Sequence, residues 1–155
     1  QSRSSAASDV YKRQGLTSLR DFMVENNRIR RLPTEVFRPL SNVESIFLSD
    51  NQIEVLDGRL FLSNRRLREI DLVRNRVNEI GRNIVEGLTA LHVFNIFRNR
   101  CADNIWVVDE TTTSDSIRSG LNTCFANFDA TRRLRVEIRG TATVSDDYGN
   151  EIASV

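Results

Sequence analysis

The sequence predicts an α/β protein whose repeating units build a curved parallel β-sheet and whose C-terminal end is closed by a short helical cap. Three observations predict this fold class. Apolar residues recur in phase every 24 residues, each unit contains a short stretch in which apolar and polar residues alternate, and residues with helical spacing follow the last unit. Repetition at such a period is typical of solenoids, in which each unit buries its apolar face against the next.

An asparagine marks one position in every unit. These residues lie 24 positions apart and are Asn27, Asn51, Asn75 and Asn99. Each follows an alternating stretch, such as Leu67, Ile70 and Leu72, which predicts a strand with one apolar face. Asparagine suits the turn after a strand because its amide bonds to backbone groups that the strand leaves unpaired. Phe37 and Phe61 are expected to pack as a spine on the far side of the units.

These residues follow the pattern L-x-x-L-x-L-x-x-N-x-L, and over about residues 16–100 the chain resembles leucine-rich-repeat (LRR) proteins in their 24-residue form. The resemblance implies a leucine-rich-repeat solenoid of four repeats over residues 15–100, with the parallel sheet on its concave face. It also implies non-covalent protein binding rather than catalysis. The alternative is four amphipathic helices joined by loops. That alternative fits poorly because Pro33 and Gly81 interrupt helical stretches and because alternation precedes each asparagine.

Residues 101–128 are expected to form the cap. One apolar helix face is predicted from the spacing of Ile117, Leu121, Cys124, Phe125 and Phe128, and Ser114 or Asp115 is expected to cap its start. The family resemblance implies a disulfide between Cys101 and Cys124, in a reduced two-cysteine version of the four-cysteine cap, most similar to small secreted insect proteins. A disulfide implies an oxidising, extracellular compartment. The alternative is two buried free thiols in a cytosolic protein.

Residues 1–14 are excluded from the fold. They lack the repeat, an initiating Met and the apolar core of a signal peptide, and they resemble the translated library-adapter tail of transcriptome sequences. This interpretation implies that the native chain begins near Gly15 and is truncated upstream; the alternative is a natural disordered N-terminus. The formal net charge of +1 becomes −1 without the charged residues of this segment, which are Arg3, Asp9, Lys12 and Arg13.

Residues 129–155 leave the repeat and form an unassigned extension. Alternation of Leu134, Val136 and Ile138 predicts a strand over residues 133–139. Gly140 then allows a turn into a short β-hairpin. The alternative is the start of a further segment.

Side chains suited to catalysis or metal binding are scarce. His92 is the only histidine, and neither a nucleophile motif nor a glycine-rich phosphate-binding motif accompanies it, so we expect no enzyme and no cofactor. Two cysteines and a distant histidine do not make a four-ligand zinc site. The sequence contains no run of about 18 apolar residues, and therefore it predicts no membrane span. A nearly neutral charge without a base-stacking platform argues against nucleic acid.

Outward side chains of the predicted strands form the candidate binding surface. Apolar residues there have no packing role within the repeat, and in polar surroundings they are typical of protein interfaces. Single exposed apolar residues are also normal on protein surfaces, which is the alternative explanation. The predicted partner-binding residues on the concave face are Met23, Phe47, Val73, His92, Val93, Asn95 and Phe97.

Arginines gather in the third and fourth repeats. Arg74 with Arg98 and Arg76 with Arg100 recur at one repeat's spacing, which predicts two short basic columns. Guanidinium groups bind oxyanions through paired hydrogen bonds, so these columns indicate an anion such as a sulfated glycan or an acidic protein patch. The alternative is a solvated flank balanced by nearby Glu and Asp.

The sequence therefore predicts a non-catalytic recognition module of a secreted or cell-surface protein, which binds a protein ligand through the concave sheet. Two alternatives stay open. One is a structural or scaffold segment of a larger matrix or receptor protein. The other is a glycan-binding module that uses the arginine columns.

Overall fold

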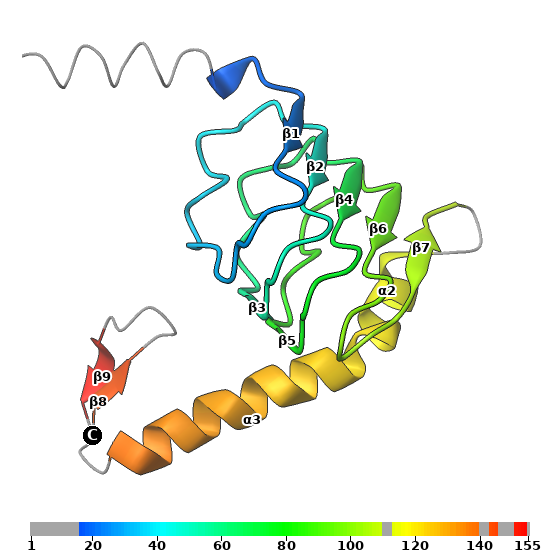
Figure 1. Ribbon diagram of the computed structural model, residues 1–155. Helices are drawn as coiled ribbons and strands as arrows, with labels where there is room; N and C mark the ends of the chain where they lie inside the picture. The colour runs from blue at the N-terminus through cyan, green and yellow to red at the C-terminus, as the bar shows by residue number, and fades with distance from the viewer. Residues whose placement is uncertain (1–15, 110–112, 140–142, 146–150, 155) are drawn as a thin grey trace, which may run out of the picture.

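The computed structural model describes residues 16–109, 113–139, 143–145 and 151–154, with side chains up to residue 134. The predicted leader, residues 1–14, lies outside the described residues. The chain winds through stacked units that contribute neighbouring strands to one sheet (Figure 1). In spatial order the strands of this five-stranded sheet are β1 (Asp21–Met23), β2 (Ser45–Phe47), β4 (Glu69–Asp71), β6 (Val93–Asn95) and β7 (Ile105–Val107).

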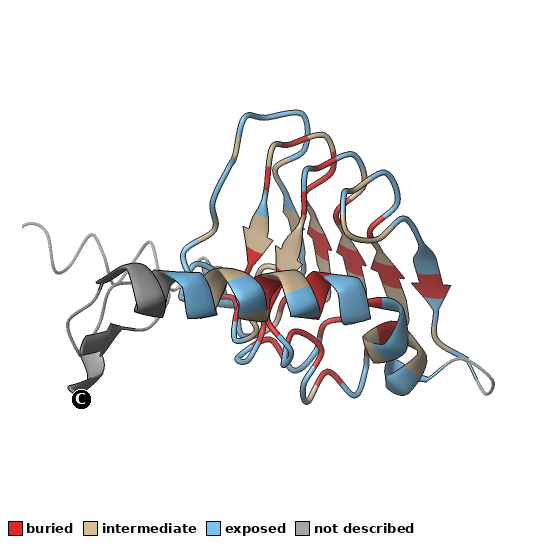
Figure 2. Cartoon of the chain, turned by 90° about the horizontal axis from the view of Figure 1, so that it is seen from below, coloured by how far each residue is buried: buried red, intermediate tan, exposed pale blue. Residues whose placement is uncertain are grey.

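The strands β1, β2, β4 and β6 are parallel and pair at the spacing of the repeat. The middle residues of these strands are Cα partners in successive pairs: Phe22, Ile46, Ile70 and Phe94. The last three are fully buried, and the residues on either side of them are more exposed (Figure 2). This alternation agrees with the sequence pattern. Parallel strands together with helices confirm the predicted mixed α/β class.

A second, two-stranded sheet forms where each unit turns back, at the lower edge of the stack in Figure 1. There β3 (Val55–Leu56) pairs with β5 (Glu79–Ile80) in parallel. The residue after β5 must be glycine, because a Cβ on Gly81 would lie 2.3 Å from the backbone nitrogen of Gly58. Neighbouring units thus approach each other closely through their backbones at this edge.

The predicted spine of phenylalanines is confirmed. The rings of Phe37 and Phe61 stack with centroids 5.6 Å apart and 15° between their planes, and both residues are buried. Phe22 meets Phe37 edge-on at 5.4 Å. Val85 takes the same position in the third unit and is also buried, so the spine becomes thinner there.

Asn51 joins two neighbouring units through its side-chain amide. Its Nδ2 donates to the carbonyl oxygens of Val24 and Leu48 at 2.9 and 3.0 Å, and its Oδ1 accepts from the backbone N–H of Ile29 at 3.1 Å. Equivalent bonds, one and two units further on, are made by Asn75 and Asn99. At the start of the row, Asn27 is exposed and its Nδ2 donates to two carbonyl oxygens of its own unit.

The strand β7 runs antiparallel to β6 and takes the place that a further repeat would occupy. Trp106 lies opposite Phe94 in the register, and the two ring centroids are 6.0 Å apart. Trp106 is buried and therefore covers the end of the apolar ladder. The 24-residue pattern does not predict this strand, because its residues fall outside the repeats.

Two helices form the cap where the sequence predicts one short helix. They are α2 (Ser114–Gly120) and α3 (Asn122–Arg139). The N-cap residue of α2 is Thr113, so the predicted cap at Ser114 or Asp115 is wrong, and Thr113 makes no side-chain capping bond. The cap is also longer than predicted, because α3 has 18 residues.

The break between the helices, at Leu121, brings the cap against the last strand and the last repeat. A Cβ on Gly120 would lie 2.3 Å from the indole of Trp106, so this close approach requires glycine. Cys101 and Cys124 form the disulfide that the family resemblance implies, and their Cα atoms are 5.0 Å apart. The disulfide therefore fixes α3 to the end of the repeats.

The strand predicted over residues 133–139 is wrong, because α3 continues through this segment. Polar side chains of α3 bond to the neighbourhood of β5. Asn127 Nδ2 donates to the carbonyl oxygen of Asn78 at 2.9 Å, and Arg82 pairs with Asp129 at 2.6 Å. These contacts fix the helix along the edge of the stack.

A two-stranded antiparallel sheet follows α3. It consists of β8 (Thr143–Ser145) and β9 (Glu151–Ser154). The hairpin expected in this part of the chain is therefore displaced, since both strands lie beyond the segment 133–139.

Candidate functional site

The outer sheet face is the side of the five-stranded sheet that points away from the buried core. Alternate residues of each strand reach it, because successive side chains of a strand point to opposite sides. In β6, Phe94 is fully buried, whereas Val93 and Asn95 on either side are half-buried. At the other end of the sheet, Met23 is 62% exposed and lies in register with Phe47, which is half-buried. The structure thus brings these predicted contact residues to one face.

The strand β7 extends the outer sheet face with two apolar side chains. Ile105 and Val107 flank the buried Trp106 and are 50% and 46% exposed. The register places Val107 opposite Val93 and Ile105 opposite Asn95. Sequence reasoning missed both residues, although the alternation around Trp106 is a strand signal that was available.

An apolar strip therefore lies on the outer sheet face at the end nearest the cap. Phe97 follows β6 and is 44% exposed. Val73 holds the same position one repeat earlier and is half-buried. The backbone N–H of Arg74 donates to the carbonyl oxygen of Phe97 at 3.0 Å and links these two repeats beside the strip. The members of the apolar strip are Val73, Val93, Phe97, Ile105 and Val107.

Two polar side chains on the outer sheet face bond to the backbone. Asp71 Oδ1 accepts from the N–H of Val73 at 2.9 Å, and Asn95 Oδ1 accepts from the N–H of Phe97 at 3.2 Å. Each side chain thereby closes a turn on the residue two positions later. Asn95, predicted as a partner contact, thus positions Phe97 at the end of β6.

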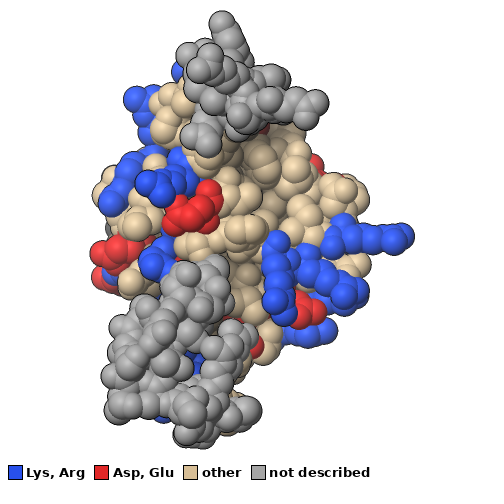
Figure 3. Space-filling model, turned by 90° about the vertical axis from the view of Figure 1, so that its left-hand side faces the viewer, with Lys and Arg blue, Asp and Glu red and all other residues tan. Residues whose placement is uncertain are grey.

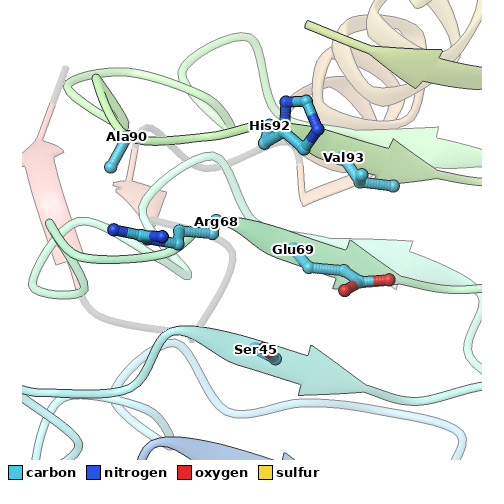
Figure 4. Close-up of a pocket in the computed structure, with 6 residues that line it drawn as sticks. All are labelled: Ser45, Arg68, Glu69, Ala90, His92 and Val93. Atoms are coloured by element: carbon cyan, nitrogen blue, oxygen red, sulfur yellow. The ribbon is translucent and has the colours of Figure 1, made fainter.

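A hollow of about 440 Å³ lies where the strands of the outer sheet face begin. It is lined by Ser45, Arg68, Glu69, Ala90, His92 and Val93 (Figure 4). His92 Nδ1 lies 2.9 Å from the carbonyl oxygen of Val108. Because a carbonyl only accepts, this contact places the proton on Nδ1. Val93 belongs to both the hollow and the apolar strip, so the two surfaces are continuous.

The arginines of the first predicted basic column have different surroundings. Arg74 Nη1 lies 3.4 Å from a carboxylate oxygen of Asp50, so part of its charge is balanced. The guanidinium carbon of Arg98 lies 5.5 Å from the ring centroid of Phe97, which is a cation–π contact. Both residues have positive φ, as do the equivalent residues of the first two units.

The arginines of the second column, Arg76 and Arg100, are exposed. Neither forms an ion pair within the part of the chain that the structure describes. Basic side chains are not confined to these repeats. On the side of the molecule shown in Figure 3, arginines gather in two groups on either side of a largely uncharged band. What distinguishes Arg76 and Arg100 is therefore their recurrence at one repeat's spacing together with the lack of an ion pair at either position.

Comparison with known proteins relates the repeats to a family. Residues 17–77 match the family model described as "Leucine rich repeat". This match supports a leucine-rich-repeat protein. Leucine-rich repeat-containing protein 3B of Bos taurus, Mus musculus and Homo sapiens is 32% identical over 89 residues, which cover 57% of this chain and 32% of each relative. The chain spans about a third of the length of these curated relatives.

Leucine-rich-repeat domains commonly bind proteins, and the outer sheet face is the surface on which the apolar side chains collect. Within the described ranges, no group of three or more His, Cys, Asp or Glu side chains is placed to hold a metal ion. No helix among the residues described is both long and apolar enough to cross a membrane.

Proposed function

We propose that this chain is a non-catalytic recognition module of a secreted or cell-surface leucine-rich-repeat protein, and that it binds a protein ligand through the outer sheet face. This face corresponds to the concave face of the predicted solenoid. The observation that carries the proposal is the apolar strip. Phe97, Ile105 and Val107 are each close to half exposed, although they adjoin a ladder of fully buried residues.

The energetics of the strip favour an interface. Fully burying one side chain of this size contributes about 1.5–3 kcal/mol relative to leaving it exposed. The strip also lies on a paired sheet, so its backbone loses little further freedom when a ligand binds. Phe97 is the aromatic member of the strip, and aromatic residues are enriched in protein interfaces.

The disulfide supports the extracellular part of the proposal. Cys101 and Cys124 are joined, and such bonds persist in oxidising compartments. The bond also attaches the cap on which the position of β7 depends. A compartment that keeps the bond oxidised therefore keeps Ile105 and Val107 in place on the outer sheet face.

Selection from a phage-displayed random dodecapeptide library tests the site. We expect the immobilised wild-type chain to enrich peptides, and Phe97→Glu and Ile105→Glu each to reduce capture of those peptides at least tenfold. Leu62→Glu is the matched control, because Leu62 is 48% exposed but lies outside the five-stranded sheet. Circular dichroism establishes that each variant is folded. Failure of the wild-type chain to enrich peptides, or equal capture by all variants, would favour the scaffold interpretation.

A second candidate function is binding of a sulfated glycan, and the unpaired arginines Arg76 and Arg100 favour it. Parallel guanidinium groups bind sulfate oxygens through charge-assisted hydrogen bonds. Retention on a heparin column tests this candidate. Arg76→Ala with Arg100→Ala should elute at clearly lower salt than Arg132→Ala with Arg133→Ala, which removes the same charge from α3. Equal elution of both double variants would dispose of a specific glycan site.

A further inference from the structure

We infer that the ligand segment recognised by the apolar strip combines apolar side chains with a carboxylate that pairs with Arg98. The inference rests on the proposed function, because it specifies the chemistry of the partner at the same surface. It commits to one occupant, an acidic and apolar segment of a partner protein, for which the charge beside the strip is the argument.

Recognition at the strip must use side chains. The strand β6 is paired with β4 on one edge and with β7 on the other, so its backbone groups are engaged in the sheet. A ligand that lies across β6 therefore meets Val93 and Phe97 through their side chains and not through strand pairing. Side-chain contact makes the surface selective for the type of residue that the ligand presents.

Arg98 supplies the charge at one end of the strip. Its guanidinium carbon lies 5.5 Å from the centroid of the Phe97 ring, a cation–π contact. No ion pair of this guanidinium is formed within the described residues. An exposed arginine next to an apolar surface can donate two parallel hydrogen bonds to one carboxylate. The ring of Phe97 thus lies beside both the apolar strip and the guanidinium.

Three acidic side chains at this end of the repeats bond to backbone N–H groups or to another arginine, and not to the guanidinium of Arg98. Asp103 accepts the backbone N–H of Arg98 at 2.7 Å, and Asp71 accepts that of Val73. Asp50 faces Arg74 rather than Arg98. A carboxylate from a ligand therefore supplies the ion-pair partner that the fold does not give to Arg98.

The hollow marks the other end of the strip and limits the length of the segment. Val93, at the start of β6, lines the hollow, and Phe97 lies four residues further on. Because β6 ends at Asn95 and Phe97 lies in the turn that follows, the two residues are at most roughly 13 Å apart, the length of a fully extended segment of this size. The expected ligand segment is therefore short, with apolar side chains over Val93 and Ile105 and with its carboxylate beside Phe97.

The test uses the same dodecapeptide library and then one synthetic peptide pair. Among peptides whose capture depends on Phe97, we expect Asp or Glu next to an apolar residue to be enriched. Selection on Arg98→Glu should replace these acidic residues with Lys or Arg. Arg133→Glu carries the same change of net charge on α3, and selection on it should keep the acidic preference.

The most enriched peptide is then compared with its Asp→Asn or Glu→Gln version. On the wild-type chain we expect the amide version to bind about tenfold more weakly, whereas on Arg98→Gln the two versions should bind alike. Capture that depends on Phe97 but shows no acidic preference, or the same carboxylate effect on both proteins, overturns the inference and leaves the proposed function standing. Capture that is independent of Phe97 overturns the proposed function itself.

Discussion

The backbone N–H of Arg98 donates a 2.7 Å hydrogen bond to Oδ1 of Asp103. In the earlier units the equivalent N–H groups donate to a carbonyl oxygen of the following unit, and they belong to Asn26, Asp50 and Arg74. All four positions have a positive φ, from 52° to 59°. Asp103 therefore replaces the carbonyl group that a further repeat would supply, and the cap satisfies the last N–H of the row with a side chain.

Removal of this carboxylate should destabilise the cap end. We expect Asp103→Ala to lower the free energy of unfolding by about 1.5 kcal/mol, because hydrogen bonds to charged groups contribute about 1.5–3 kcal/mol and this bond is exposed. Asp103→Asn should cost less, since it keeps an acceptor oxygen. Urea denaturation followed by circular dichroism measures both. Asp115→Ala removes an exposed carboxylate that pairs within α2 and should change stability by less than about 0.5 kcal/mol. A loss in Asp103→Ala no larger than in this control would contradict the prediction.

The asparagines that recur every 24 residues should contribute unequally to the stability of the stack. Asn75 is buried, and Asn75→Ala leaves the buried N–H of Ile53 unpaired and removes one of the two amide donors to each of the carbonyl oxygens of Leu48 and Leu72. We expect it to cost about 2–3 kcal/mol, because one buried unpaired group costs about 1–3 kcal/mol and two further hydrogen bonds are lost. Asn27→Ala should cost less than about 1 kcal/mol, since Asn27 is exposed and water can replace its bonds. Urea denaturation of the two variants measures the free energy of unfolding that each substitution removes. Similar losses for Asn75→Ala and Asn27→Ala would show that burial does not determine how much each asparagine contributes to stability.

The contact between Gly120 and Trp106 can be followed optically, because Trp106 is the only tryptophan of the chain. Gly120→Ala should push the indole away from its buried position, shift the fluorescence emission to longer wavelength and cost about 1–3 kcal/mol, as overpacking does. Ser119→Ala, at the adjacent exposed position of α2, is the control and should leave the emission unchanged. An unchanged emission maximum in Gly120→Ala would mean that the close approach does not hold Trp106.

Much of the stack could be predicted from the sequence because a single 24-residue period determines which of its residues are buried. The position of Asn51 in the period specifies which neighbours are buried, and the buried strand residue Ile46 follows from alternation alone. The helical conformation beyond residue 133 could not be predicted in this way, because Leu134 and its alternating neighbours fit a strand as well as a helix. The contacts that fix α3, such as Asn127 with Asn78, join residues 49 positions apart. A local pattern contains no signal for them.

Only the part of the candidate site that lies within the 24-residue repeats could be predicted from the sequence. Alternation placed Val93 and Phe97 on the outer sheet face, because both lie within the repeat. Ile105 and Val107 were missed because β7 replaces a repeat instead of continuing it, and only the pairing with β6 brings them to that face. The balance between Arg74 and Asp50 likewise depends on a contact between neighbouring repeats, which composition does not reveal.

The disulfide should be the largest single contribution to the stability of the cap. It closes a loop with a sequence separation of 23 residues, for which constraint of the unfolded chain gives about 3 kcal/mol. We therefore expect reductant to lower the urea midpoint of the wild-type chain and to leave that of a Cys101→Ser, Cys124→Ser variant unchanged.

Intact mass after alkylation under native, non-reducing conditions gives an independent measurement of the same bond. The wild-type chain should gain no label before reduction and two labels after it. If both thiols are labelled in the native protein, the bond is absent, and the extracellular assignment loses its support. The outer sheet face could then still bind a partner, but β7 would be held only by its pairing with β6 and by the packing of Trp106 on Phe94, without a covalent link to the cap. In that case Ile105→Glu should weaken peptide capture less than Phe97→Glu, because Phe97 lies within the repeats and does not depend on the cap.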